Sequence, residues 1–123
     1  MIEIVWEYEI KEEARGFFEL AFGPGGAWSN LFASAPGYRG TTLLRGTENV
    51  GHYLCLDLWD TLPQQKQWLA EHPSELAKLE ADFVRWTLSR RELGVFTALA
   101  EANVRPRRST QRGITGPRRR RTR

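Results

Sequence analysis

The sequence predicts one α+β domain with the element order strand, helix, strand, strand, helix, strand. Three observations carry this prediction. Residues 2–10 alternate in polarity, residues 14–22 place apolar side chains three and four positions apart, and residues 38–59 contain two β-prone segments around a short link. The 123 residues suit a single domain with its own core. This is the ferredoxin-like βαββαβ order, with helices on one face of an antiparallel sheet.

The first strand and the first helix follow from a change in the spacing of apolar residues. Along residues 2–10 one face is apolar at every second position, which is typical of a half-buried strand. From Lys11 the spacing becomes that of an amphipathic helix, whose stripe is Ala14, Phe17, Phe18, Ala21 and Phe22. The Gly23-Pro24-Gly25-Gly26 run ends this helix, and a short helical piece at about 27–34 follows.

Two central strands are predicted at residues 38–46 and 50–59, where β-branched, aromatic and leucine side chains concentrate. The short link between them suits a hairpin, so the two strands should pair antiparallel. A last strand is predicted at residues 93–99.

The second long helix has a defined start and an interruption. Thr61 and Gln64 form a capping box, with Pro63 in the first turn where its missing N–H costs nothing. Pro73 interrupts the helix, which resumes with Ser74 as its predicted cap. The apolar stripe of this second part is formed by Leu76, Leu79, Phe83 and Trp86.

One face of the predicted sheet has no helix to cover it. The strands carry apolar or aromatic residues on both faces, whereas the helices suffice for one face. A second copy of the chain is the simplest cover for the other. The sequence therefore predicts a homodimer.

Charge is divided unevenly along the chain. Residues 103–123 contain nine arginines and no acid, so residues 1–102 hold the other nine of 18 bases against all 15 acids, a net charge of −6. Residues 103–123 are also almost free of apolar side chains, which predicts a disordered arginine-rich tail after a folded domain at 1–102. Because no aromatic residues are interleaved for base stacking, we expect this tail to contact nucleic acid only nonspecifically.

Cysteine content and hydropathy limit the compartment and the chemistry. The single cysteine, Cys55, excludes an intramolecular disulfide and a multi-cysteine metal site. The first residues lack the basic start and apolar run of a signal peptide, and no segment approaches the roughly 20 apolar residues of a membrane span. We therefore expect a cytoplasmic protein with no membrane contact and no metal.

Four motifs in residues 1–99 resemble the antibiotic biosynthesis monooxygenase family. They are the turn from Gly23 to Trp28 with Leu31-Phe32 after it, the run from Pro36 to Thr41, the strand end from Leu56 to Thr61, and Leu93-Gly94-Val95-Phe96. The resemblance implies a dimeric α+β barrel. It also implies a relationship to cofactor-independent oxygenases of polycyclic aromatic substrates and to haem-degrading enzymes.

The strand at residues 50–59 carries the candidate catalytic residues. Tyr53, Asp57 and Trp59 share one face of this strand, and His52 lies on the other. Tyr53, Asp57 and His52 can each move a proton, so these three are the candidate acid–base groups. The alternative is that His52 lies near solvent at the strand start and that Asp57 binds local backbone.

Three tryptophans and one arginine are the candidate substrate-binding residues. Trp28, Trp59 and Trp68 could wall a planar aromatic molecule. Arg39 could hold an anionic or quinone-like group. The alternatives are a core position for Trp68 and, for Arg39, cross-strand ion pairs with the glutamates of residues 2–10.

Trp68 and His72 lie four apart on a helix, which invites a haem hypothesis. Haem-degrading relatives combine such a tryptophan with a ligand histidine about three turns later and an asparagine on the first strand. Here Lys78 stands ten residues after Trp68, and residues 2–10 contain no asparagine. Haem degradation is therefore not expected, and His72 is interpreted as a surface residue at the point where Pro73 interrupts the helix.

Taken with this resemblance, the sequence favours a homodimeric monooxygenase that needs no cofactor and accepts a hydrophobic aromatic or phenolic small molecule between sheet and helices. The protein would contribute desolvation, orientation and assisted deprotonation. The alternative is a homodimer that binds a ligand without catalysis or is purely structural.

Overall fold

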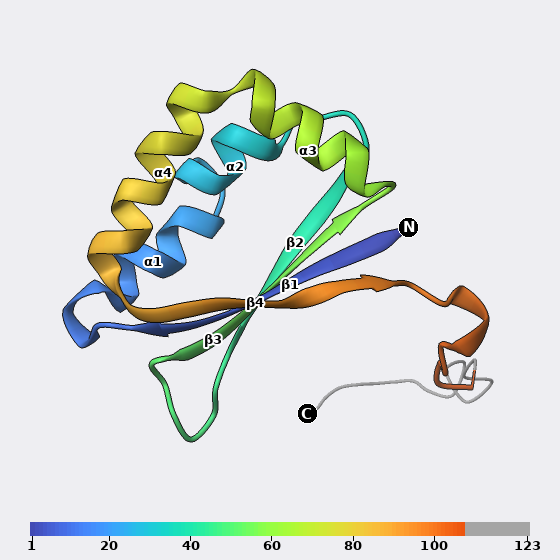
Figure 1. Cartoon of the computed structure of the whole chain (residues 1–123). Coiled ribbons are helices and arrows are strands. Elements are labelled where there is room, and N and C mark those ends of the chain that lie inside the picture. Colours follow the sequence, from blue (N-terminus) through green and yellow to red (C-terminus); the bar gives the residue numbers. More distant parts are fainter. Residues whose placement is uncertain (108–123) are drawn as a thin grey trace, which may run out of the picture.

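The computed structural model describes residues 1–107, in which helices lie against one face of a four-stranded antiparallel sheet (Figure 1). The strands are β1 (Ile2–Ile10), β2 (Tyr38–Arg45), β3 (His52–Trp59) and β4 (Thr87–Thr97), in the order β2-β3-β1-β4. The helices are α1 (Arg15–Phe22), α2 (Ala27–Phe32), α3 (Leu62–Glu71) and α4 (Pro73–Trp86), with 3-10 turns at Glu12–Ala14 and Ala100–Ala102. The predicted ferredoxin-like α+β fold is confirmed.

The central pair β1 and β3 sets which side chains face the helices. Ile4 lies opposite Asp57 and Tyr8 lies opposite Tyr53, so even positions of β1 and odd positions of β3 point to the same side. On this side Tyr8, Tyr53 and Trp59 are almost completely buried. The alternation predicted for residues 2–10 is therefore the alternation between core and open face.

Aromatic rings hold the helices on the sheet. Phe18 of α1 and Phe83 of α4 are fully buried, with ring centroids 5.6 Å apart. Phe18 also packs 4.9 Å from the Tyr53 ring, and Phe83 lies parallel to Trp28 of α2 at 5.9 Å. Burial of each such side chain stabilises the fold by about 1.5–3 kcal/mol, so this cluster fixes three helices at once.

The last strand differs from the prediction of residues 93–99. β4 begins at Thr87, directly after α4. Its register with β1 shifts, so that Gly94 lies opposite Val5 and Glu92 lies opposite Trp6, with Leu93 as an extra residue. Gly94 adopts φ 151° at this bulge. The bulge changes which residues of β4 point to each face of the sheet. A search for a regular period of two therefore missed the first half of β4.

One predicted helix cap is confirmed, and two other details of the helices differ from expectation. The Thr61 side chain accepts a hydrogen bond from the Gln64 N–H at 3.4 Å, which confirms that cap. Ser74 is not a cap, because α4 already begins at Pro73 and His72 occupies the N-cap position. Phe17 is 63% exposed rather than buried, and its ring stacks on Trp86 at the surface.

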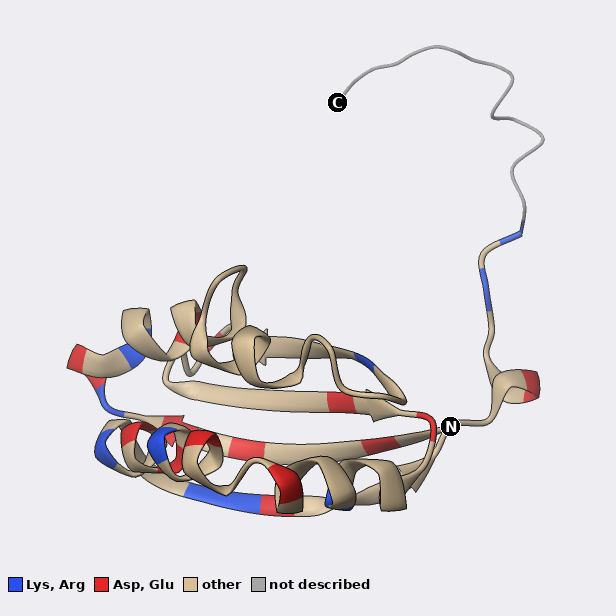
Figure 2. Cartoon of the chain, turned by 90° about the horizontal axis from the view of Figure 1, so that it is seen from above, with Lys and Arg blue, Asp and Glu red and all other residues tan. Residues whose placement is uncertain are grey.

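The face of the sheet away from the helices carries both apolar and charged residues. At its centre Val5 lies opposite Leu56, and Leu44 of β2 lies opposite Leu54. Figure 2 shows that acidic and basic residues are spread over strands as well as helices. No helix among residues 1–107 is long and apolar enough to cross a membrane. Most of the predicted tail, residues 108–123, lies outside the described residues.

Candidate functional site

A cavity of about 90 Å³ lies between the sheet and the helices. Its aromatic walls are Trp6 and Tyr8 of β1, Trp28 and Phe32 of α2, and Trp59 of β3. Its polar groups are Asp57 of β3, Gln65 of α3, Glu80 of α4 and Arg90 of β4. An apolar pocket with a few convergent polar groups is the usual form of a small-molecule site.

Asp57 is the one buried charged residue among the described residues, and 5% of its surface is exposed. Its Oδ1 accepts a hydrogen bond of 2.6 Å from the Thr41 hydroxyl and lies 3.9 Å from the Cys55 thiol. Burial raises the pKa of Asp57 to about 7, although the hydrogen bonds from Thr41 and Cys55 oppose the rise. A carboxyl group with this pKa can take up or release a proton near neutral pH.

The Thr41 hydroxyl connects Asp57 to two further side chains. The register places Thr41 of β2 directly opposite Asp57 of β3. Trp28 Nε1 donates a hydrogen bond of 2.9 Å to Thr41 Oγ1, and the Tyr38 hydroxyl lies 2.5 Å from the same atom. Burial is also the main cause of a raised pKa at Tyr38, which keeps this phenol protonated. The carboxyl of Asp57 is therefore held at the end of a hydroxyl network.

Arg90 and Gln65 add polar groups to other parts of the cavity. Arg90 forms an ion pair with Glu80, which raises the pKa of the guanidinium, and it lies 5.3 Å from the centre of the Trp6 ring. Gln65 Oε1 is buried and has no hydrogen-bond partner among residues 1–107. It can therefore accept a hydrogen bond from a bound molecule.

Of the seven site residues predicted from the sequence, the structure brings Asp57, Trp28 and Trp59 together in the cavity. Tyr53 faces the same side of β3 but lines a separate hollow of about 400 Å³ with Glu19. There its hydroxyl donates a hydrogen bond of 2.5 Å to Glu19. Burial and this carboxylate raise the pKa of Tyr53 to about 12.

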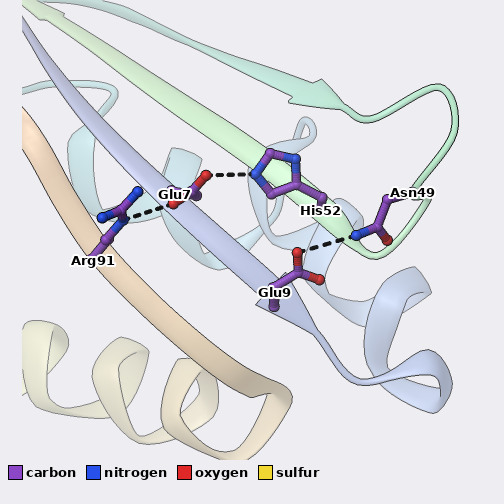
Figure 3. Close-up of polar contacts among 5 residues, drawn as sticks. All are labelled: Glu7, Glu9, Asn49, His52 and Arg91. Carbon is purple, nitrogen blue, oxygen red and sulfur yellow. Dashed lines mark hydrogen bonds and ion pairs between the residues drawn. The ribbon is translucent and has the colours of Figure 1, made fainter.

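His52 lies on the opposite face of the sheet, in a polar group with Glu7, Arg91, Glu9 and Asn49 (Figure 3). Its Nε2 is 2.8 Å from Glu7 Oε2, and Arg91 Nε donates to Glu7 Oε1 at 2.8 Å. The hydrogen bonds from Arg91 and His52 lower the pKa of Glu7. The sheet itself separates His52 from Asp57.

Trp68 also lies outside the cavity. Its Nε1 donates a hydrogen bond of 2.8 Å to the Leu31 carbonyl, and its ring stacks on His72 with centroids 3.9 Å apart. Both rings line a surface groove of about 460 Å³ between α2 and the later helices.

Arg39 forms an exposed ion pair with Asp60, through hydrogen bonds of 2.7 Å and 3.1 Å. The ion pairs expected with the glutamates of β1 are not made, because β3 lies between β2 and β1. Arg39 lies at a register shift between Tyr38 and Gly40, which makes it an extra residue of β2.

Several cavity residues were missed from the sequence. Trp6 and Tyr8 share the apolar face of β1, and their pairing with the face of Asp57 could have been read from an antiparallel β1–β3 register. Gln65 and Glu80 gave no local signal, because their positions depend on how helices pack. Arg90 reaches the cavity side only because of the bulge at Leu93.

Among the residues that the structure describes, no group of three or more histidine, cysteine, aspartate or glutamate side chains could hold a metal ion.

No family model matches the sequence. A search of curated proteins finds no match either.

Solved structures give clear similarities. A mutant form of SnoaB, a cofactor-independent oxygenase from Streptomyces nogalater, is 25% identical with a TM-score of 0.65, over 79% of this chain and 91% of SnoaB. A protein assigned as an antibiotic biosynthesis monooxygenase from Nitrosomonas europaea shares the fold at 12% identity and a TM-score of 0.64, over 80% of this chain and 99% of that chain. One from Deinococcus radiodurans does so at 13% identity and a TM-score of 0.64, over 86% and 100%. The structures from Nitrosomonas europaea and Deinococcus radiodurans show a shared fold, and the similarity to SnoaB, with the motifs of residues 1–99, supports the assignment of the chain to the antibiotic biosynthesis monooxygenase family.

Proposed function

We propose that the chain is a cofactor-independent monooxygenase that binds a hydrophobic aromatic or phenolic molecule in the cavity, with Asp57 as the group that accepts its proton. The observation that carries the proposal is a buried carboxyl of pKa about 7 that lines an aromatic cavity. The similarity to SnoaB, a cofactor-independent oxygenase, supports the same class of reaction.

The reaction needs little from the protein beyond deprotonation and positioning. Removal of a proton makes a phenolic substrate electron-rich enough to give an electron to dioxygen. One oxygen atom of dioxygen then replaces two hydrogens on a substrate carbon, and the other leaves as water. Among the described residues the hydrogen bonds of Asp57 all reach Oδ1, which leaves Oδ2 for the substrate proton.

The aromatic walls would orient the substrate, and the Gln65 oxygen would accept a hydrogen bond from a phenolic hydroxyl. At about 90 Å³ the cavity is smaller than the roughly 300–1,000 Å³ of most ligand pockets. A polycyclic molecule therefore requires a helix to move outward. Helix α3 has no fully buried residue, so its displacement would expose less of the core than displacement of α1, α2 or α4.

A second copy of the chain would cover the open face of the sheet, where Val5, Leu54 and Leu56 have no helix above them. This homodimer would leave the cavity accessible, because the cavity lies on the helix side.

Oxygen uptake tests the proposal directly. Protein free of metal and flavin is given anthrone-like and hydroquinone-like compounds, and dioxygen consumption is followed. We expect Asp57→Asn to lower the rate by about 10²–10⁴ with the fold intact. Tyr53→Phe is the matched control, because it removes a phenolic hydroxyl from the same strand face but from a different hollow.

The outcomes separate the two functional readings. Binding of the compounds without oxygen uptake would favour a ligand-binding homodimer. If the panel neither binds nor drives oxygen uptake, the monooxygenase proposal is wrong.

A further inference from the structure

Asp57 is buried on a central strand, yet its hydrogen-bond network runs sideways toward the edge of the sheet. Thr41 and Tyr38 both belong to β2, which is the edge strand next to β3. Asp57 is 5% exposed, whereas Tyr38 is only partly buried. The oxygen-to-oxygen distances along the path are 2.6 Å from Asp57 to Thr41 and 2.5 Å from Thr41 to Tyr38. Both are short enough for proton transfer along hydrogen bonds.

The indole of Trp28 determines how the Thr41 hydroxyl can be used. A hydroxyl has one hydrogen and two lone pairs, and an indole N–H can only donate. Trp28 therefore occupies one lone pair of Thr41 Oγ1 in every state. One hydrogen and one lone pair remain for Asp57 and Tyr38. Thr41 must donate to one of these neighbours and accept from the other, so the path has two states of opposite direction.

We propose that Thr41 and Tyr38 form a proton relay that connects the buried Asp57 carboxyl with solvent at the edge of the sheet. The proposal rests on the proposed role of Asp57 as a proton acceptor. When Asp57 has taken up a proton, its carboxyl group turns so that the protonated oxygen donates to Thr41, Thr41 donates to Tyr38, and Tyr38 donates to water.

Three protons then shift by one hydrogen bond each. The Asp57 proton passes to Thr41 Oγ1, the Thr41 hydrogen passes to the Tyr38 oxygen, and the Tyr38 hydrogen passes to water. Thr41 and Tyr38 end as neutral hydroxyls, Asp57 ends as a carboxylate, and one proton has reached solvent. The reverse sequence returns a proton to Asp57 while the cavity stays closed.

The other groups that face Asp57 do not offer this path. The Cys55 thiol and the Tyr8 hydroxyl both have a pKa raised by burial, and Cys55 is fully buried. Glu80 and Arg90 lie on the cavity side and are paired with each other. A proton that enters past this pair would need an open cavity. The two routes are therefore distinguishable by variants of the relay.

A pH-jump experiment on the full chain measures the relay without substrate. The solution is taken from above to below the pKa of Asp57, and the carboxyl vibration is followed by time-resolved infrared spectroscopy. The Asp57 signal is identified as the one lost in Asp57→Asn. We expect Tyr38→Phe and Thr41→Val to slow its appearance on the order of 10²-fold, the scale of one positioned proton-transfer group.

Two matched variants remove the same groups from outside the path. Tyr53→Phe removes a phenol bound to Glu19, and Thr42→Val removes a hydroxyl from the opposite face of β2. Both should protonate Asp57 at the rate of the unaltered chain. Tyr38→Phe leaves the bond from Thr41 to Asp57 in place, so it tests the relay even if Thr41→Val lowers stability.

Equal rates in Tyr38→Phe and the unaltered chain would overturn the relay and indicate entry through the cavity. The relay is also overturned if no infrared signal depends on Asp57, because this carboxyl group then takes up no proton in the pH range of the jump. A slowed rate in a chain that consumes no dioxygen with any compound would retain the relay and reject the monooxygenase. Oxygen uptake with unaltered protonation rates would do the reverse.

Discussion

Burial of Asp57 should make the stability of the protein fall as pH rises toward neutrality. Its pKa is about 7 in the folded state and returns to the ordinary 3.8 when the chain unfolds. Between these values the folded protein holds one more proton than the unfolded chain. The free energy of unfolding therefore decreases with pH across this window and becomes constant above the folded pKa.

The magnitude follows from the difference of about three pH units between the two pKa values. At about 1.36 kcal/mol for each unit, ionisation of the buried carboxyl costs about 4 kcal/mol. About 3 kcal/mol of this cost falls between about pH 5 and about pH 8. Asp57→Asn removes the ionisation and keeps an oxygen that can accept the hydrogen bond of Thr41. The variant should therefore gain stability relative to the unaltered chain as pH rises.

Urea denaturation of both proteins, at one protein concentration and several pH values, measures this difference. Subtraction of the two curves removes the contribution of every other titrating group. Asp60→Asn is the control, because Arg39 lowers the pKa of Asp60 and keeps it ionised throughout the window. Curves for Asp57→Asn and the unaltered chain that stay parallel within about 0.5 kcal/mol would show that the Asp57 pKa is not raised.

Three further changes test the fold and the open face. Phe83→Ala should lower the free energy of unfolding by about 3–5 kcal/mol, because it leaves a cavity at the centre of the aromatic core. An unchanged urea midpoint would show that Phe83 does not support this core. Thr61→Ala should cost about 1 kcal/mol through loss of the α3 cap, and a thermal midpoint equal to that of the unaltered chain would contradict this role. Leu56→Glu on the open face should convert a dimer to a monomer in sedimentation, whereas Leu20→Glu, at a position 71% exposed on α1, should not. A monomer of the unaltered chain at micromolar concentration would refute the dimer.

The sequence was sufficient for elements whose pattern is local and regular. The alternation of residues 2–10 and the N-cap at Thr61 both appear in the structure because neither depends on distant partners. The Gln64 side chain accepts a hydrogen bond from the Thr61 hydroxyl, so the reciprocal half of the capping box is not made. The first half of β4 was missed, because the extra residue Leu93 breaks its period. No local pattern could mark that break in advance.

The candidate site was only partly predictable for the same reason. Tyr53, Asp57 and Trp59 share a strand face, as their spacing indicates, but only the helices decide that Asp57 and Trp59 line the cavity while Tyr53 lies in another hollow. The position of Trp68 depends on the side of α3 that meets α2. Sequence spacing identifies a face, and packing decides which part of that face is a site.

The bulge at Leu93 also protects the pairing of β4 from an error of one residue. In an unbroken ladder Leu93 would lie opposite Trp6, and Glu92 would lie opposite Glu7. Two carboxylates in direct cross-strand contact repel each other. With the bulge, Arg91 takes the place opposite Glu7 and forms an ion pair, while its neighbour Arg90 turns to the other side of the sheet. The order of charges in β4 therefore favours one alignment of β4 with β1. A deletion of Leu93 or a charge reversal at Glu92 should change which alignment of the two strands is preferred.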